Sequence, residues 1–276
     1  MRWVIAMGAA ALTAACVSTP SSVELHARVE ASPLPPVDVR LFLQPEHQRD
    51  GDRYLRAAVA TLTTCGEWLG PFPRASLTLA DPSWRWGPAA REGAVLLDRT
   101  PWWSPKTSMA PELATARAVS RAFWRERIDT TRLPPWFFDG LAEYVARRAV
   151  MPLFERENTS PGYAFLEERY FDGFVPRFVR IRLLAETDGD PVAAYRTRPD
   201  IGMAAPPRPS GDARSLAGGT LLALGTLERW LGRPVFDQIV AEFARESRPG
   251  RPTIADFART ATDVSGQDLS WFFDAA

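Results

Sequence analysis

Two adjacent prolines, Pro134 and Pro135, separate two helical patterns and constrain this chain more than any other feature. Proline lacks a backbone N–H and clashes with the preceding helical turn, so one helix cannot run through both patterns. Each pattern has an apolar stripe at helical spacing. The stripes consist of Leu113, Ala116, Val119 and Phe123 before the prolines, and Phe137, Leu141, Tyr144 and Val145 after them. The sequence therefore predicts two packed helices within 112–148, the second starting at Trp136.

Charged residues follow the same helical spacing beside these stripes. Arg117 and Arg121 lie one turn apart on the first helix, and Asp139, Glu143 and Arg147 follow at i, i+4 and i+8 on the second. We predict that the two arginines point toward Asp139 and Glu143 and form an arginine–carboxylate network between the helices. The alternative is a solvated charge ladder on the surface.

The remaining chain predicts an α+β fold with a small N-terminal mixed β-sheet, one helix beside it and a mainly helical C-terminal half. Strands are expected at 37–43, 75–80 and 93–98 and a helix at 50–68, because period-two and short apolar runs alternate with a helical run. Further helices are expected at 218–231 and 234–246, with a loop at 151–162. Thr253 with Asp256 predicts the capped start of another helix.

The first residues have the pattern of a processing signal. A positive start and an apolar run lead to Thr13-Ala14-Ala15-Cys16, which resembles a bacterial lipoprotein signal with Cys16 as the lipidated residue; ordinary secretion is the alternative. This divides the chain into a signal peptide at 1–15, a Ser/Pro-rich tether at 16–36 and a single domain at 37–276. Within that domain, 37–110 forms the sheet part and 111–276 the helical part. We expect a lipid-anchored protein on the periplasmic face of the bacterial cell envelope, at the outer membrane because Val17 follows the cysteine.

Composition removes some classes of function. The formal net charge is zero, so no basic surface favours nucleic acid, and that partner is not expected. Cys65 lies in a helical run and is interpreted as core filling, because His26 and His47 fall in or near the tether and outside any catalytic motif.

Four tryptophans cluster in two Pro/Gly-rich segments: Trp84, Trp86, Trp102 and Trp103. Exposed indole rings can stack on sugars, which would suit a cell-wall carbohydrate ligand. The structural interpretation, that they cover a sheet edge or cap the cleft, is favoured because they are not accompanied by an acidic pair of the kind that glycosidases use.

Three stretches together resemble the catalytic domain of aminopeptidase N-like gluzincin zinc metallopeptidases. They are residues 69–77, the stretch Trp136-Phe137-Phe138-Asp139-Gly140 with the residues up to 144, and residues 264–273. Their order and approximate spacing match over most of the chain. The resemblance implies the gluzincin, thermolysin-like catalytic-domain architecture.

The residues that such an enzyme needs are missing here. The resemblance places Arg117, Ala118 and Arg121 where the family has His-Glu-x-x-His, and Asp139 where it has the third zinc ligand, a glutamate. A guanidinium stays protonated and has no lone pair for a metal, and alanine cannot act as the general base. Shifting the register by one residue puts Ala116, Arg117 and Ser120 at these positions. This restores neither a histidine nor the general base. The family's amine-anchoring glutamate is also absent from 93–97, and its transition-state tyrosine falls near Ser215 or Leu216.

We therefore expect a catalytically inactive, metallopeptidase-like envelope lipoprotein without zinc or another cofactor. It would contact the membrane through lipid on Cys16 and bind a peptide or an envelope protein through its vestigial cleft. Arg117, Ala118, Arg121, Asp139 and Glu143 are the vestigial metal-site positions. The alternatives are an active hydrolase with an atypical site and a carbohydrate binder that uses the four tryptophans.

Overall fold

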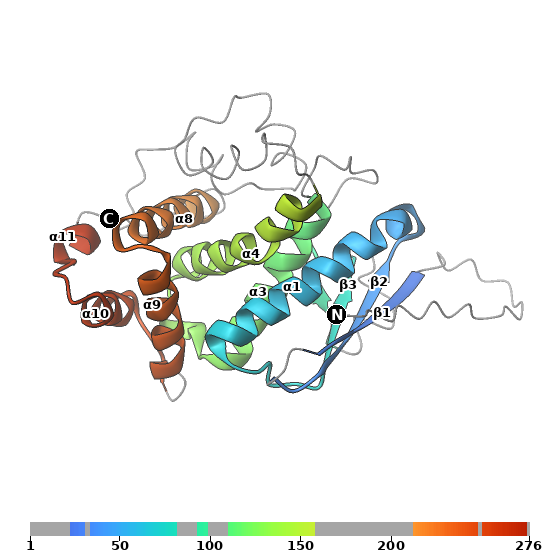
Figure 1. Cartoon of the computed structure of the whole chain (residues 1–276), viewed down its shortest axis with the longest axis horizontal. Helices are drawn as coiled ribbons and strands as arrows, with labels where there is room; N and C mark the ends of the chain where they lie inside the picture. The colour runs from blue at the N-terminus through green and yellow to red at the C-terminus, as the bar shows by residue number, and fades with distance from the viewer. Residues whose placement is uncertain are drawn as a thin grey trace, which may run out of the picture.

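The computed structural model describes residues 23–30, 34–81, 93–98, 110–157, 212–247 and 250–274. The interpretations that rest on Cys16 and on Trp84, Trp86, Trp102 and Trp103 lie outside these residues. Within them, a four-stranded sheet stands at one end and helices fill the rest (Figure 1). The α+β fold class predicted from the sequence is confirmed.

The sheet is mixed, as predicted, with the strand order β1-β2-β3-β4. Strand β1 (Val23–Val29) runs antiparallel to β2 (Val37–Leu43), whereas β2 and β3 (Ser76–Ala80), and β3 and β4 (Val95–Leu96), are parallel. Three strands match predicted ones, but β4 has two residues where six were expected at 93–98.

The first strand corrects the predicted tether at 16–36. Residues 23–29 pair with β2 along its whole length, from Val23 opposite Leu43 to Val29 opposite Val37, so this part of the predicted tether belongs to the sheet. Residues alternate along β1 between half-buried and exposed up to the buried Val29. The sequence contains this period-two signal, but the Ser and Pro residues around it favour a tether.

A long helix covers one face of the sheet. Helix α1 (Gly51–Leu69) follows a short 3-10 helix, η1 (Pro45–Asp50), and corresponds to the predicted helix at 50–68. A Cβ atom at Gly51 would collide with the side chain of Leu25 on β1, so the missing side chain lets helix and strand approach closely. Cys65, on α1, is fully buried, and this burial raises the pKa of its thiol, consistent with core filling.

The two central helices have the predicted break between them. Helix α3 (Ala110–Arg127) ends before a 3-10 turn, η3 (Thr130–Arg132), and helix α4 (Pro135–Glu157) begins at the second proline. The loop predicted at 151–162 is wrong for 151–157, because α4 continues through Pro152. Met151 and Leu153 pack on a buried cluster formed by Ala57, Leu113, Ala116, Ala146 and Val150, and this packing offsets the hydrogen bond that proline removes.

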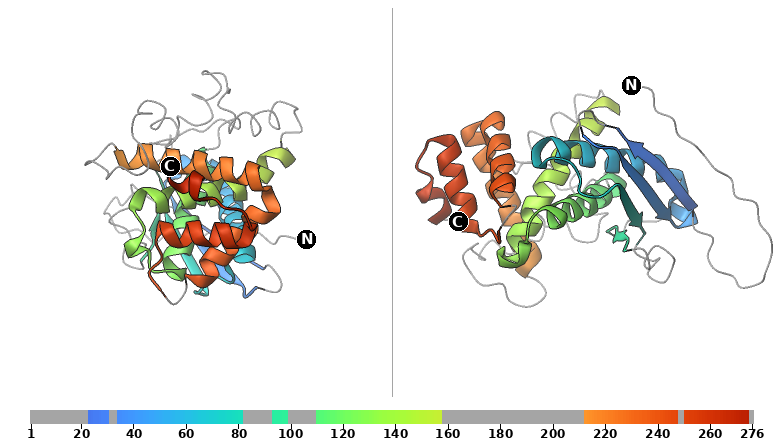
Figure 2. Two further views of the ribbon diagram at one scale, coloured as in Figure 1. Left: turned by 90° about the vertical axis from the view of Figure 1, so that its left-hand side faces the viewer. Right: turned by 90° about the horizontal axis from the view of Figure 1, so that it is seen from below.

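Four more helices complete the described chain: α8 (Asp212–Leu231), α9 (Arg233–Glu246), α10 (Ile254–Ser265) and α11 (Ser270–Asp274). They lie on the side of α4 away from the sheet (Figures 1 and 2). The predicted cap of α10 is confirmed as a full capping box between Thr253 and Asp256. Gly266 ends this helix with a φ of 65°, which glycine adopts without strain.

One hydrophobic core joins the sheet to the helices. It runs from β2 through α1, α3 and α4 to α9 and α10. The predicted apolar faces of α4 and α9 both lie in it, with Tyr144, Val145, Phe236 and Phe243 almost inaccessible to solvent. Within the described residues, no helix combines the length and hydropathy needed to cross a membrane.

Candidate functional site: an arginine–carboxylate network between two helices

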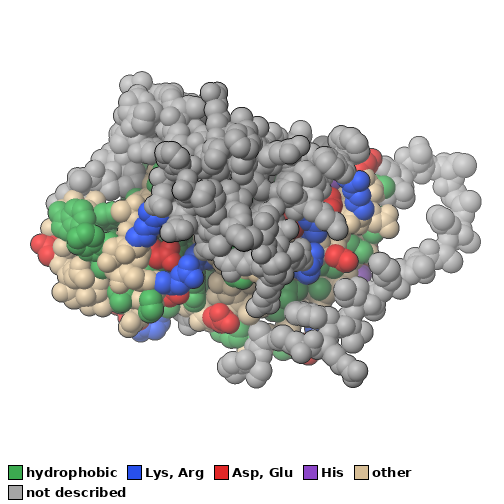
Figure 3. All heavy atoms as spheres, turned by 45° about the horizontal axis from the view of Figure 1, so that its top comes forward, with side chains coloured by type: hydrophobic (Ala, Val, Ile, Leu, Met, Phe, Trp, Pro, Cys, Tyr) green, Lys and Arg blue, Asp and Glu red, His purple; other side chains and the backbone are tan. Residues whose placement is uncertain are grey.

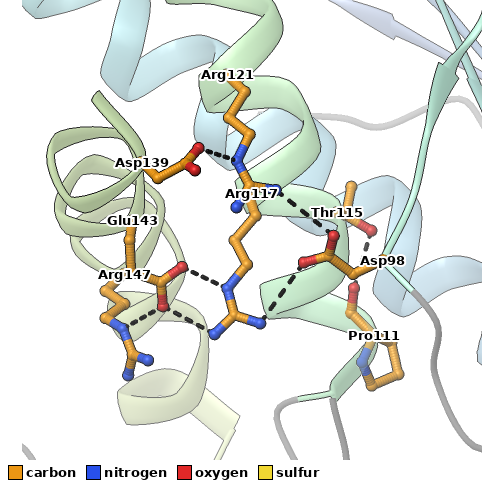
Figure 4. A network of polar contacts seen from close by, with 8 residues as sticks. All are labelled: Asp98, Pro111, Thr115, Arg117, Arg121, Asp139, Glu143 and Arg147. Atoms are coloured by element: carbon orange, nitrogen blue, oxygen red, sulfur yellow. Dashed lines mark hydrogen bonds and ion pairs between the residues drawn. The ribbon is translucent and has the colours of Figure 1, made fainter. Parts of the chain in front are cut away.

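The charged residues singled out in the sequence meet where α3 packs against α4 (Figure 4). Arg117 and Arg121 reach across from α3, and Asp139, Glu143 and Arg147 project from α4. The apolar stripes of both helices are buried in the core, so their packing fixes the distance between the two charged rows.

The inner part of this network is a buried triad of Arg117, Glu143 and Arg147. Arg117 donates from Nε to Oε2 and from Nη2 to Oε1 of Glu143, the latter at 2.8 Å, a two-point pairing of guanidinium and carboxylate. Arg147 donates from Nε to the same Oε1 at 2.5 Å. The side chains of Arg117 and Glu143 are each only 3% exposed. The predicted network is therefore present, and the solvated ladder is wrong for Glu143 and Arg147.

The outer part of the network is half-exposed and consists of Arg121, Asp139 and Asp98. Arg121 Nε donates to Asp139 Oδ1 at 3.1 Å, and Arg121 Nη1 lies 3.5 Å from Asp98 Oδ1. Asp98, just after β4, also lies 3.7 Å from Nη1 of Arg117 and so joins the two parts. Sequence reasoning missed Asp98; its only signal was a carboxylate at the end of an apolar run.

Burial and charge act in opposite directions on Glu143. Removing the carboxylate from water raises its pKa, but Arg117 and Arg147 outweigh this effect and lower the pKa to about 2. Glu143 is therefore a stable anion between two cations. The network contains three arginines and three carboxylates, so its charges balance.

The residues at this site do not fit a zinc ion. Arg117 and Arg121 offer only protonated guanidinium groups, and both are committed to carboxylates. Ala118 has no polar side chain, and in the shifted register Ala116 has none either. Ser120 is fully buried, and its hydroxyl has no hydrogen-bond partner among the described residues. A cluster of three or more His, Cys, Asp and Glu side chains suited to a metal is likewise not found in this part of the chain.

The two histidines occupy different environments in the structure. His47 lies in η1 and is buried, with Nδ1 2.5 Å from Oδ2 of Asp81 at the end of β3. His26 is exposed on β1. Both are part of the folded unit. The tether assignment is therefore wrong for His26, whereas His47 lies within the domain predicted at 37–276.

On the described part of the face drawn in Figure 3, the charges are mixed in sign. Figure 3 shows basic and acidic side chains close to one another on the described part of one face, without a broad field of either sign. This distribution agrees with the formal net charge of zero.

Comparison with known proteins identifies the fold. No protein-family model and no curated protein matches the sequence. Solved structures do match: aminopeptidase A of Legionella pneumophila at 13% identity, and a mutant of a two-domain M1 zinc metallopeptidase, bound to L-tryptophan or to L-arginine, at 15%. The TM-score is 0.50 in each case.

Each match covers 92% of this chain, but 28% of the Legionella enzyme and 51% of the two-domain one. The chain thus has a fold similar to the corresponding part of M1 zinc metallopeptidases and spans about half of the two-domain protein and less of the Legionella enzyme. The architecture implied by the resemblance in the sequence is confirmed, and at this identity the likeness concerns the fold alone.

Proposed function

We propose that this chain is a pseudo-aminopeptidase, a metallopeptidase-like protein that does not cleave peptides and acts by binding a peptide or protein. One observation carries the proposal: a buried guanidinium, that of Arg117, pairs at two points with Glu143 where the resemblance places a metal ligand. The guanidinium of Arg117 would then link α3 and α4 in place of a zinc ion.

The carboxylates present are poorly suited to replace the missing general base. A general base works best when its pKa is near the working pH. The pKa of Glu143 is lowered to about 2, and its oxygens are held by Arg117 and Arg147, so it has little tendency to take a proton from water. An active hydrolase with an atypical site therefore gains no support from this network.

Binding is supported by the outer part of the network. Arg121, Asp98 and Asp139 have side-chain exposures of 29%, 28% and 38%, so they can exchange hydrogen bonds with a ligand while the buried triad holds the helices. Together they offer both donors and acceptors, which a peptide backbone requires.

Metal analysis tests the loss of catalysis. Purified full-length protein, dialysed against zinc and then against buffer, is expected to contain no stoichiometric zinc. It should leave aminoacyl-p-nitroanilides uncleaved, and a chelator should not change its thermal unfolding. One zinc per chain, or chelator-sensitive cleavage, would instead establish an active metallopeptidase.

Peptide binding is tested separately, by selection from a random peptide library on the immobilised protein. Selected peptides should bind Arg121→Gln and Asp139→Asn at least tenfold more weakly than the unchanged chain. Arg245→Gln is the matched control, because Arg245 is exposed and paired with Glu242 on another helix, α9. Equal binding to all three variants would place the ligand elsewhere.

We further propose that the protein is anchored in the cell envelope through lipid on Cys16, with residues 1–15 removed. Mass spectrometry of the N-terminal peptide should show a diacylglyceryl cysteine, and Cys16→Ser should move the protein from the membrane fraction to the soluble one. An unmodified Cys16 in the mature protein would contradict the anchor.

A further inference from the structure

Strand β1 forms one border of the described sheet, because it pairs with β2 on one side and the strand order begins with it (Figures 1 and 2). Such an edge presents backbone N–H and C=O groups that can pair with another strand. The seven residues of β1 read Val-Glu-Leu-His-Ala-Arg-Val. This sequence is complementary to a second copy of itself that runs in the opposite direction.

The complementarity appears when β1 is placed antiparallel to a second β1 with His26 at the centre. Glu24 of one copy then lies opposite Arg28 of the other, twice by symmetry. Leu25 lies opposite Ala27, Val23 opposite Val29 and His26 opposite its own copy. Only this register pairs all seven residues. Shifting the centre to Ala27 sets His26 opposite Arg28 and Glu24 opposite Glu30.

The side chains concerned are accessible. Glu24, His26 and Arg28 are 42%, 56% and 56% exposed and share the face of β1 opposite the side chains that face α1. Arg28 now pairs with Glu30 at 3.0 Å and Asp38 at 3.1 Å, and Glu24 lies 3.2 Å from His26. Exposed pairs of this kind contribute little, so exchanging them for pairs between copies costs little.

We propose that two copies of this chain associate through their β1 strands, antiparallel and centred on His26, to form a continuous sheet. On the other face, the half-buried Leu25 and Ala27 of the two copies meet across the new border. Opposite charges placed directly across paired strands stabilise them, and like charges destabilise them. This inference is independent of the proposed function. An interface of two edge strands is small, so we expect a dissociation constant on the order of micromolar.

Charge reversal tests the proposal. Full-length protein carrying Cys16→Ser, to prevent lipid attachment, should show a concentration-dependent dimer in sedimentation velocity. Glu24→Arg and Arg28→Glu should each shift the equilibrium to the monomer, because each sets like charges opposite one another twice. An equimolar mixture of the two variants should form a heterodimer, since it restores both opposite-charge pairs.

Cross-linking tests the register. In the same background, His26→Cys should form a disulfide-linked dimer under mild oxidation, because opposed residues on paired strands have Cβ atoms about 5 Å apart. Glu24→Cys is the control. Its two copies would be four residues apart along the strands, about 13 Å, beyond disulfide reach. Cys65 is fully buried and should not interfere.

Three results would overturn the proposal. They are a monomer at all concentrations up to about a hundredfold above the expected micromolar value, a dimer that neither charge variant weakens, and equal cross-linking at positions 24 and 26. Circular dichroism of each variant would show that the fold is retained. These substitutions are at exposed positions, so we expect it to be.

Discussion

At the scale of single residues, the chemistry of this protein depends on what surrounds Glu143. A carboxylate that is 3% exposed would ordinarily be protonated or excluded from a core. Here Arg117 approaches it from the neighbouring helix and Arg147 from the next turn of its own helix. The cost of burying three charges is therefore offset only while all three are present.

Glu143→Gln should be strongly destabilising. The amide keeps the shape but leaves two guanidinium groups without the carboxylate that they share, so we expect a loss of about 3 kcal/mol or more in the free energy of unfolding, measured in urea. Asp139→Asn is the control, because Asp139 is 38% exposed and its pair should contribute under about 1 kcal/mol. Equal losses would show that the buried triad contributes no more to the free energy of unfolding than the exposed pair of Arg121 and Asp139.

The pKa of Glu143 predicts how stability depends on pH. Its value in the folded chain, about 2, lies below the ordinary 4.5, so the unfolded chain binds the proton more tightly. The contribution of Glu143 is complete above about pH 4.5 and is lost as the pH falls toward 2. The total loss should be about 3 kcal/mol.

A variant with Arg117→Met, Glu143→Leu and Arg147→Met removes this titration. Because it replaces the whole buried triad by apolar side chains and leaves none of its charges behind, it should remain folded at neutral pH. Its free energy of unfolding should then fall less steeply between pH 4.5 and 2 than that of the unchanged protein. If the free energy of unfolding fell equally in both proteins between pH 4.5 and 2, the pH dependence would be due to other carboxylates.

At the scale of elements, the described helices divide into those that local sequence specifies and those that packing specifies. Helix α10 has its start and end written in the sequence, as a capping box at Thr253 and a glycine at 266. Helix α4 instead extends through Pro152, where local sequence argues for an end. Its last described turns depend on the cluster beneath Met151 and Leu153.

Thr253→Ala should therefore destabilise the protein by about 1 kcal/mol, because it removes the side-chain acceptor for the N–H of Asp256 at the start of α10. The matched control is Thr226→Ala on α8, whose hydroxyl donates within its own helix to the carbonyl of Leu222. We expect little change there. Urea unfolding of both variants measures the difference, and equal losses would contradict a specific role for the cap.

At the scale of the whole molecule, Arg148 connects four helices. From α4 it donates to Glu228 of α8 at 2.9 Å and to Asp237 of α9 at 3.1 Å, and its guanidinium lies 5.5 Å from the ring centre of Trp68 on α1. The pKa of Asp237 is raised. Burial is the largest cause and the neighbouring Glu228 adds to it, and together they outweigh the lowering by Arg148. Arg148 thus holds together two carboxylates that would otherwise repel each other.

Arg148→Met should cost about 2 kcal/mol, since it leaves two partly buried carboxylates facing each other. A double-mutant cycle with Asp237→Asn separates the pair from the rest: the second substitution should cost less in the Arg148→Met background than alone. Additive losses would show that Arg148 does not act through Asp237 and would leave its contacts with Glu228 and Trp68 as the source of the loss.

Much of the fold could be predicted because its signals are local. Apolar periodicity predicted β2, β3, α1, α3 and α9, and the prolines before Trp136 predicted where α4 begins. Strand β1 was missed because its alternating pattern lies in a Ser/Pro-rich context and is completed only by pairing with β2. The pairing of His47 with Asp81 was missed because they are 34 residues apart.

The sequence by itself determined that Arg117 and Arg121 lie on one helix, that Asp139 and Glu143 lie on the next, and that imidazoles are missing from the positions that the resemblance assigns to a metal. Residue types and helical spacing are enough for these statements. The tertiary structure alone decided that Arg117 pairs with Glu143 and Arg121 with Asp139, and that Asp98 joins them. Which charges meet depends on how far the packed helices are displaced along each other, and that displacement is fixed by the apolar contacts between them.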